Sequence, residues 1–162
     1  MTTRTVRALG LALLVAQGCS SGYQRAYDRE TQKLQTQAQA QDARDKAEHA
    51  EASRYAAVVY FDVGSAVVGQ DGDRELSWFV EKMQPYPKAQ ILVQGFADST
   101  GGEEKNKTLS EDRARAVAAA LSAKGIAAPR MDVRGFGTDS PAAANVTAKG
   151  RNRNRRVEVT VR

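Results

Sequence analysis

The sequence predicts an α+β domain over residues 55–162, in which a mixed sheet of about four strands carries its helices on one face. Two observations support this fold class. Short runs rich in β-branched residues alternate with two longer segments whose apolar residues recur at helical spacing. The resulting order is strand, helix, strand, helix, strand and strand.

An apolar run predicts the first strand at residues 57–61, and a loop at residues 62–65 ends it. A helix is expected from Asp71, because apolar residues then recur every three or four positions and would line one side of it. This stripe consists of Leu76, Phe79, Val80 and Met83. The prolines at positions 85 and 87 end the helix.

The second strand is expected at residues 89–95, where Ile91 and Val93 would share one face of the sheet. A polar loop follows at residues 96–105. The second helix is expected over residues 106–124, because an apolar stripe runs through it and Gly125 is a favourable residue for ending a helix.

The last part of the chain predicts two further strands separated by a long loop. Residues 131–135 alternate between apolar and polar side chains, and residues 156–161 alternate strictly. Between these strands, residues 136–154 contain glycine, proline and asparagine at several positions, which predicts a loop.

Residues 1–18 have the composition of an export signal, with basic residues before the apolar run 8–16. The run is shorter than the about 20 residues that a membrane-spanning helix needs. Cys19 follows Gly18 directly and resembles the end of a bacterial lipobox, which implies cleavage before Cys19 and its lipidation with acyl chains such as palmitate. Ser20 favours sorting to the outer membrane. The alternative is an ordinary secretory signal followed by a free cysteine.

Residues 19–54 are expected to form a polar spacer, because they are rich in Gln and Ala and Leu34 is their only large aliphatic residue. A coiled coil requires repeated apolar positions, which this segment lacks. The composition fits either a solvated helix or a disordered tether.

Composition also excludes several classes of function. One cysteine and one histidine cannot build a disulfide framework or a Cys/His zinc site, so we expect no metal and no cofactor. The histidine, His49, lies in the polar spacer, which argues against a catalytic triad. Asp98, Glu103 and Glu104 fall in a single loop without an aromatic sugar cleft, so we expect no enzyme. The basic tail from Lys149 belongs to an exported chain, so nucleic acid is not expected.

Several motifs occur in an order that strongly resembles the OmpA-like C-terminal domain family, which includes the peptidoglycan-associated lipoproteins. They are Tyr60-Phe61-Asp62, the segment from Gly95 to Gly101, the helix pattern of Asn106, Leu109, Ser110, Arg113 and Ala114, Gly135-Phe136-Gly137, and the final Asn154-Arg155-Arg156-Val157-Glu158. The resemblance implies non-covalent binding of peptidoglycan through the diaminopimelate of its stem peptide. It also implies a periplasm-facing lipoprotein that links the outer membrane of a Gram-negative cell to the wall, with Tol-type envelope proteins as partners. A wall-anchoring subunit of a secretion or motility machine is the alternative.

The free end of diaminopimelate carries an ammonium and a carboxylate on one carbon, so its capture requires an anion and a cation a few ångströms apart. The resemblance assigns these roles to Asp98, which would accept from the ammonium, and Arg113, which would contact the carboxylate with its planar fork. Further expected contributors are Asn106, Phe61, Asp62, Ala97, Leu109 and Arg155. Asn106 could instead cap the second helix, and Asp62 could instead be a turn residue. The family often has His where this chain has Phe96, and Thr where it has Ala97, so two hydrogen bonds at the rim of the site would be absent.

Overall fold

The computed structural model describes residues 20–162, which divide into two compact units at Asp42 and Ala43. Residues 20–42 belong to the helix α1 (Ser20–Ala52), so the polar spacer is helical rather than a disordered tether. The second unit, Ala43–Arg162, contains the last turns of α1 together with the whole region expected to fold. The predicted export signal and the predicted lipidation site, Cys19, lie outside the described residues.

The second unit is built on one four-stranded sheet in the order β1-β4-β2-β3, comprising β1 (Ala57–Tyr60), β4 (Arg156–Val161), β2 (Ile91–Gly95) and β3 (Met131–Gly135). The last strand along the chain, β4, pairs antiparallel with β1 on one side and with β2 on the other, whereas β2 and β3 are parallel. The sheet is therefore mixed, and the predicted α+β class is confirmed.

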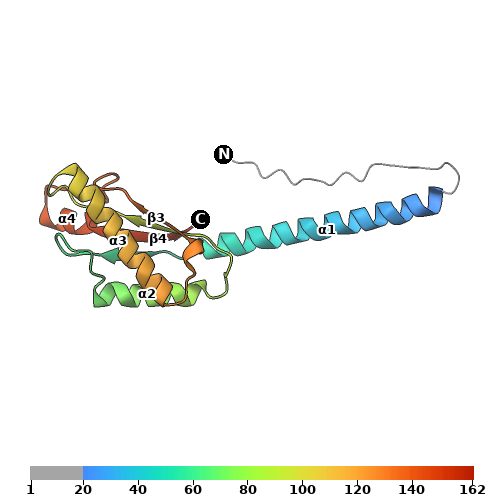
Figure 1. The fold of residues 1–162 in the computed structure, drawn as a ribbon, viewed down its shortest axis with the longest axis horizontal. Coiled ribbons are helices and arrows are strands. Elements are labelled where there is room, and N and C mark those ends of the chain that lie inside the picture. The colour runs from blue at the N-terminus through green and yellow to red at the C-terminus, as the bar shows by residue number, and fades with distance from the viewer. Residues whose placement is uncertain (1–19) are drawn as a thin grey trace. The chain divides into compact units, whose positions relative to one another are not determined.

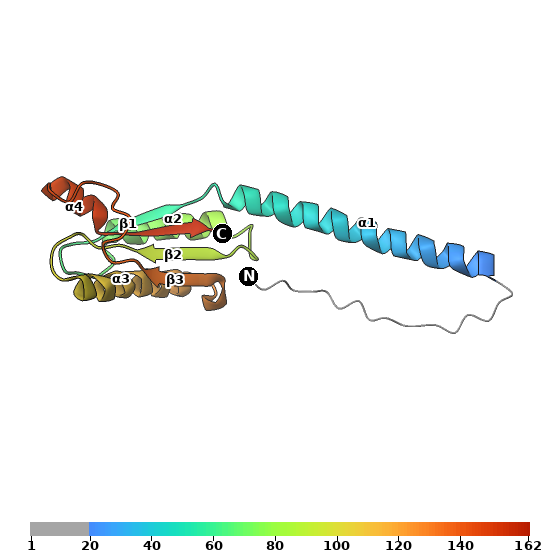
Figure 2. The same cartoon turned by 90° about the horizontal axis from the view of Figure 1, so that it is seen from above.

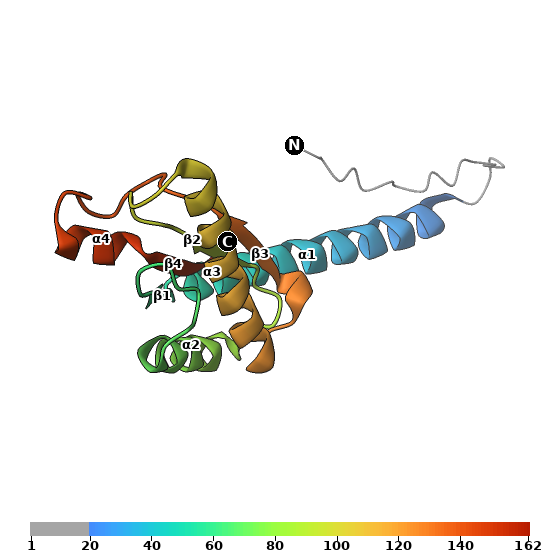
Figure 3. The same ribbon diagram turned by 60° about the vertical axis from the view of Figure 1, so that its left-hand side comes forward.

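Two helices cover one face of this sheet, as the sequence predicted. They are α2 (Gln70–Met83), which packs against β1, and α3 (Glu103–Ala123), which packs mainly against β2 and β3. The two helices also contact each other (Figures 2 and 3). The core lies between the helices and the sheet, and its fully buried side chains include Leu76, Phe79, Met83, Val117, Leu121, Val59, Ile91, Val93, Val157 and Val159.

The second helix starts earlier than the sequence analysis expected, at Glu103 instead of Asn106. Gly102 occupies the N-cap position in an extended conformation, and Glu103 and Glu104 form the first turn. Two carboxylates in a first turn favour helix formation, because the helix dipole is positive at that end. Asn106 therefore lies inside the helix, and its alternative role as a helix cap is wrong.

The long loop expected at residues 136–154 ends in a helix that the sequence analysis missed, α4 (Ala148–Asn154). Thr147 is its N-cap, and the Thr147 hydroxyl accepts a hydrogen bond from the Gly150 backbone N–H at 2.9 Å. A short 3₁₀ helix, η1 (Ala128–Arg130), precedes β3. In the ribbon, α4 lies at the same end of the sheet as the start of α3 (Figure 1).

The end of α1 is joined to the rest of the second unit by specific contacts. Ala52 is fully buried in the core, and the Tyr86 hydroxyl lies 3.2 Å from a carboxylate oxygen of Glu51. Lys88 and Asp45 form an exposed ion pair. Among residues 20–162, none of the helices combines the length and the apolar character needed to pass through a bilayer.

Candidate functional site

The end of the sheet where β2 stops is shaped by two glycines that let α3 approach closely. A Cβ atom on Gly95, the last residue of β2, would overlap the backbone carbonyl of Ser110. One on Gly135, the last residue of β3, would overlap the Glu111 backbone nitrogen. Because neither strand has a side chain at this point, the first half of α3 lies directly against the strand ends, and the loop after β2 passes beside Arg113.

Asp98 lies in that loop and is 5% exposed. Its Oδ2 accepts a hydrogen bond from Nη1 of Arg155 at 2.8 Å, and its Oδ1 accepts one from the Thr100 backbone N–H at 2.8 Å. Burial alone would raise the pKa of Asp98, but the hydrogen bonds from Arg155 and Thr100 outweigh it and hold the pKa below its usual value. The carboxylate is therefore charged at neutral pH and can accept further hydrogen bonds.

Arg113 lies beneath the same loop, with 0% of its surface exposed. Its guanidinium donates to three backbone carbonyls, those of Ser65 at 2.8 Å, Asp62 at 3.0 Å and Phe96 at 3.1 Å. It also lies 5.3 Å from the ring centre of Phe61. Burial and the nearby charge of Arg155 lower the pKa of Arg113 to about 10, although Asp98 acts in the opposite direction. Arg113 thus holds the loop after β1 against the loop after β2.

The structure brings Asp98 and Arg113 to one end of the sheet, because Arg113 binds the carbonyl of Phe96, two residues before Asp98. Asp98 makes its ion pair with Arg155, however, and not with Arg113. Both partners of this pair are nearly buried, with 10% of the Arg155 side chain and 6% of the Asp98 side chain exposed. From the sequence, Arg155 is expected only as a further contributor to the site, because no local pattern reveals a contact between residues so far apart along the chain.

Arg155 is a central group of the site. Besides Asp98, it donates from Nε to the Phe61 carbonyl at 3.0 Å and from Nη2 to the Asn152 side chain. It therefore connects the end of β1, the loop after β2 and α4. A guanidinium makes such a three-way link possible, because its five N–H groups point in fixed directions.

The other expected contributors lie at the same end of the sheet but differ in exposure. Asn106 and Ala97 are buried, and the Ala97 backbone N–H donates to the Gly137 carbonyl at 2.6 Å. Leu109 is half-buried. Asp62 is exposed, and its carbonyl accepts hydrogen bonds from Arg113 at 3.0 Å and from the Ser65 backbone N–H at 3.2 Å, so Asp62 also begins a turn, as the alternative expectation had it. Its carboxylate is thus accessible to a ligand.

Phe96 is buried, so the residue that departs from the family pattern belongs to the packing of this region. Its ring stacks on that of Phe136, with centroids 5.5 Å apart and an interplanar angle of 18°. The guanidinium carbon of Arg156 lies 4.0 Å from the centre of the Phe96 ring. An aromatic residue at this position is therefore stabilised by stacking and by a cation–π contact.

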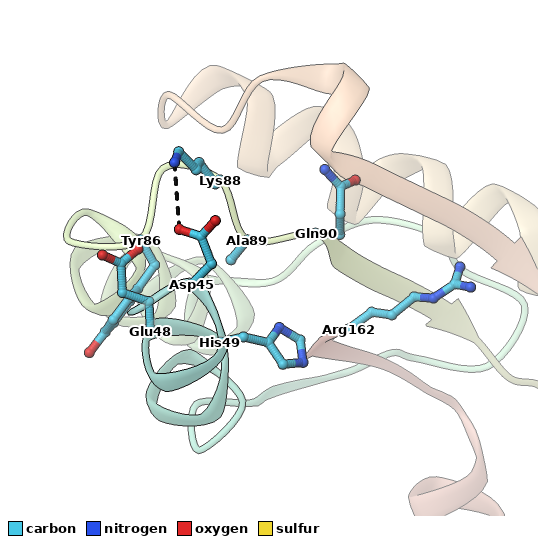
Figure 4. Close-up of a pocket in the computed structure, with 8 residues that line it drawn as sticks. All are labelled: Asp45, Glu48, His49, Tyr86, Lys88, Ala89, Gln90 and Arg162. Carbon is cyan, nitrogen blue, oxygen red and sulfur yellow. Dashed lines mark ion pairs between the residues drawn. The ribbon is translucent and has the colours of Figure 1, made fainter. Parts of the chain in front are cut away.

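A different pocket, of about 290 Å³, lies at the start of β2 (Figure 4). It is lined by Asp45, Glu48, His49, Tyr86, Lys88, Ala89, Gln90 and Arg162. None of the site residues expected from the sequence lines it. Within residues 20–162, no cluster of His, Cys, Asp or Glu side chains is arranged to hold a metal ion.

The fold and the site together define an α+β domain with a four-stranded mixed sheet and a buried cluster of charged side chains at one end. Comparison with known proteins identifies its family. The OmpA family matches residues 60–155, and the chain belongs to this family. A probable lipoprotein of Escherichia coli, YiaD, is 42% identical over 103 residues, which cover 64% of this chain and 47% of YiaD. The chain thus spans less than half the length of that curated relative.

Two solved structures are similar as well. The peptidoglycan-associated lipoprotein from Burkholderia pseudomallei has a TM-score of 0.63 and 30% identity, and the match covers 65% of this chain and 90% of that one. The cell wall anchor of the type VI secretion system (T6SS) from Pseudomonas aeruginosa has a TM-score of 0.57 and 32% identity, covering 65% and 79%. Both matches agree with the resemblance inferred from the motifs.

Proposed function

We propose that this protein is an outer-membrane lipoprotein that binds peptidoglycan non-covalently and links the outer membrane to the cell wall. The observation that carries the proposal is the convergence of Asp98 and Arg113 at the end of β2, through the carbonyl of Phe96. The similarity to a peptidoglycan-associated lipoprotein supports it. The protein would perform no bond chemistry, and Tol-type envelope proteins would be its protein partners.

In the proposed complex, the Asp98 carboxylate accepts hydrogen bonds from the ammonium of diaminopimelate, in addition to those from Arg155 and Thr100. Three of the five N–H groups of Arg113 bind backbone carbonyls, which leaves two for the ligand carboxylate. Because Arg113 is fully buried, the carboxylate reaches it only when the loop at residues 62–65 moves aside, which also releases the bonds of Arg113 to the Asp62 and Ser65 carbonyls. Phe61 and Leu109 would form the walls of the opened site.

A pull-down with two kinds of purified sacculi tests the proposal. Diaminopimelate-type walls carry the second carboxylate, whereas lysine in the same position lacks it. We expect clear preference for the diaminopimelate-type wall, because only that ligand offers an anion to Arg113. Equal binding to both walls would refute the assigned role of Arg113, and binding to neither would refute the proposed function.

The membrane end of the link depends on Cys19, which we propose to be lipidated. Two acyl chains give stable attachment to a bilayer, since each buried CH₂ contributes about 0.8 kcal/mol. One attached end would raise the local concentration of the binding domain at the wall, so that individually weak contacts add up to firm attachment. The Cys19→Ala variant should leave the membrane fraction of fractionated cells, and its retention there would contradict lipid anchoring.

The alternative function is wall anchoring as an accessory subunit of a secretion or motility machine. The similarity to the cell wall anchor of the T6SS favours this alternative. Purification of the tagged protein in mild detergent would separate the two functions. Stoichiometric recovery of a machine component would favour the alternative.

A further inference from the structure

A second groove opens beside Asp98, on the side of α4. It has a volume of about 380 Å³ and is lined by Tyr60, Phe61, Asp62, Lys149, Asn152, Arg153 and Arg155. Three of these side chains are cationic and one, Asp62, is anionic. We call this the α4 groove.

The cationic side chains on the α4 side are held in place by the local structure of the helix. Lys149, Asn152 and Arg153 are three and four positions apart, so they lie on the same face of α4. The helix is fixed by its Thr147 cap and by Gly150, where a Cβ atom would overlap the carbonyl of Ala144. The basic face therefore projects from a short helix that packs tightly on its own preceding loop.

Two of the cations are available for an external anion. Within residues 20–162, neither Lys149 nor Arg153 makes an ion pair, and both side chains belong to exposed residues. Arg155, by contrast, is committed to Asp98. The groove thus has more positive than negative charge, and Tyr60, 58% exposed at its edge, adds an apolar ring with a hydroxyl donor.

The α4 groove and Asp98 are adjacent, because Arg155 contacts both. Its Nη1 binds Asp98 and its Nη2 binds Asn152 in the groove. We infer that the α4 groove binds a second carboxylate of the same stem peptide whose diaminopimelate ammonium binds Asp98. This inference rests on the proposed function and extends it from one amino acid to a longer peptide. Where a further residue follows diaminopimelate and occupies its second carboxyl group in a peptide bond, the nearest free carboxylate belongs to the glutamate that precedes diaminopimelate.

The test compares two soluble tripeptides of alanine, glutamate and diaminopimelate, in both of which the C-terminal carboxylate of diaminopimelate is amidated. One has a free glutamate α-carboxylate, and in the other this carboxylate is amidated as well. Binding is measured by calorimetry with the wild type and with the double variant Lys149→Gln/Arg153→Gln. We expect the wild type to bind the free form about five-fold tighter, the size that two exposed ion pairs supply. The double variant should bind both tripeptides alike, while its affinity for free diaminopimelate stays that of the wild type.

A matched control removes the same charge from another face. Arg74 and Lys82 lie on α2, and the variant Arg74→Gln/Lys82→Gln should keep the full preference. The inference would be overturned if the variant Lys149→Gln/Arg153→Gln kept the preference for the free tripeptide. It would also be overturned if this variant lost as much affinity for free diaminopimelate as for the tripeptide. A wild type that binds diaminopimelate without any preference between tripeptides would overturn the inference alone. A wild type that binds none of these ligands would overturn the proposed function as well.

Anionic lipid is the competing partner for a basic groove. Vesicles containing phosphatidylglycerol therefore form a second arm of the experiment. The groove would be reassigned to a membrane surface by two results together. The wild type would bind these vesicles and the groove variant would not, and neither protein would prefer one tripeptide over the other. We expect no difference between wild type and variant in this arm, because Asp62 places a carboxylate inside the groove.

Discussion

The variant Asp98→Asn removes the negative charge at the centre of the proposed site while keeping the shape of the side chain. The amide oxygen of Asn can still accept from the Thr100 backbone N–H, as the Oδ1 of Asp98 does at 2.8 Å. The amide NH₂ group, however, would face the Arg155 guanidinium, where the folded protein now has an ion pair at 2.8 Å. The variant therefore tests the charge separately from the packing.

The structure gives an expected magnitude for each effect. Breaking a fully buried ion pair costs about 3–5 kcal/mol. Arg155 keeps its bonds to Phe61 and Asn152, so we expect a loss of about 2 kcal/mol in the free energy of unfolding, or roughly 8 °C in Tm. For binding, one charge-assisted hydrogen bond to the ligand ammonium is worth about 1.5–3 kcal/mol, which corresponds to a ten-fold to hundred-fold weaker Kd.

The assay is co-sedimentation with purified diaminopimelate-type sacculi at temperatures well below the Tm of the variant, with circular dichroism as the test of folding. Asp139→Asn is the matched control, because Asp139 is an exposed carboxylate in the neighbouring loop after β3. We expect Asp139→Asn to sediment like the wild type. Wild-type sedimentation of a folded Asp98→Asn protein would refute the assignment of Asp98 as the ammonium partner.

Three further predictions address the same end of the molecule. Arg113→Lys replaces a guanidinium that binds three backbone carbonyls by a single ammonium. Urea unfolding should show a free energy of unfolding lower by about 2–3 kcal/mol, and sacculus binding should weaken. Unchanged stability would contradict the role of Arg113 in holding the two loops together. Gly95→Ala forces a methyl group onto the Ser110 carbonyl and should lower Tm by roughly 10 °C, whereas an unaltered Tm would mean that α3 lies further from β2. Burial alone would raise the pKa of Asp98, but its hydrogen bonds hold this pKa below the ordinary value of 3.8. The charged Asp98 side chain therefore contributes fully to stability above about pH 4, and this contribution is lost as the pH falls through the lowered pKa. Sacculus binding should accordingly stay constant from about pH 7 to 5, and a decline within that range would argue against Asp98.

The strands and the two large helices could be predicted because each has a local pattern. β3 and β4 occupy the residues that their alternation predicted, and α2 ends before the prolines. The missed helix, α4, has no apolar periodicity and contains Gly150 and two asparagines, which are poor helix formers. Its one local signal is Thr147, which is a favourable N-cap residue. α4 is held in place largely by contacts with the loop before it, such as the two hydrogen bonds between Asn154 and Ala143.

The site was predictable only in part, for a related reason. The motifs predicted Asp98 and Arg113 as site residues, and a strand followed by a loop and a helix brings them to one end of the sheet. The partner of Asp98 could not be predicted, because the pairing with Arg155 depends on β4 lying between β1 and β2. The burial of Arg113 was also not predictable, since the three carbonyls that hold it come from two separate loops.

The position of β4 has a consequence for how the chain acquires its structure. β1 forms hydrogen-bonded pairs only with β4 within the described residues, and β4 also connects β1 to β2. A nascent chain, which is made from its N-terminus, cannot close the sheet until residues 156–161 have followed. Long-range pairing of this kind slows folding, because a long loop must close before any contact forms. Within the described residues, β1 therefore has no strand to pair with until residues 156–161 are present.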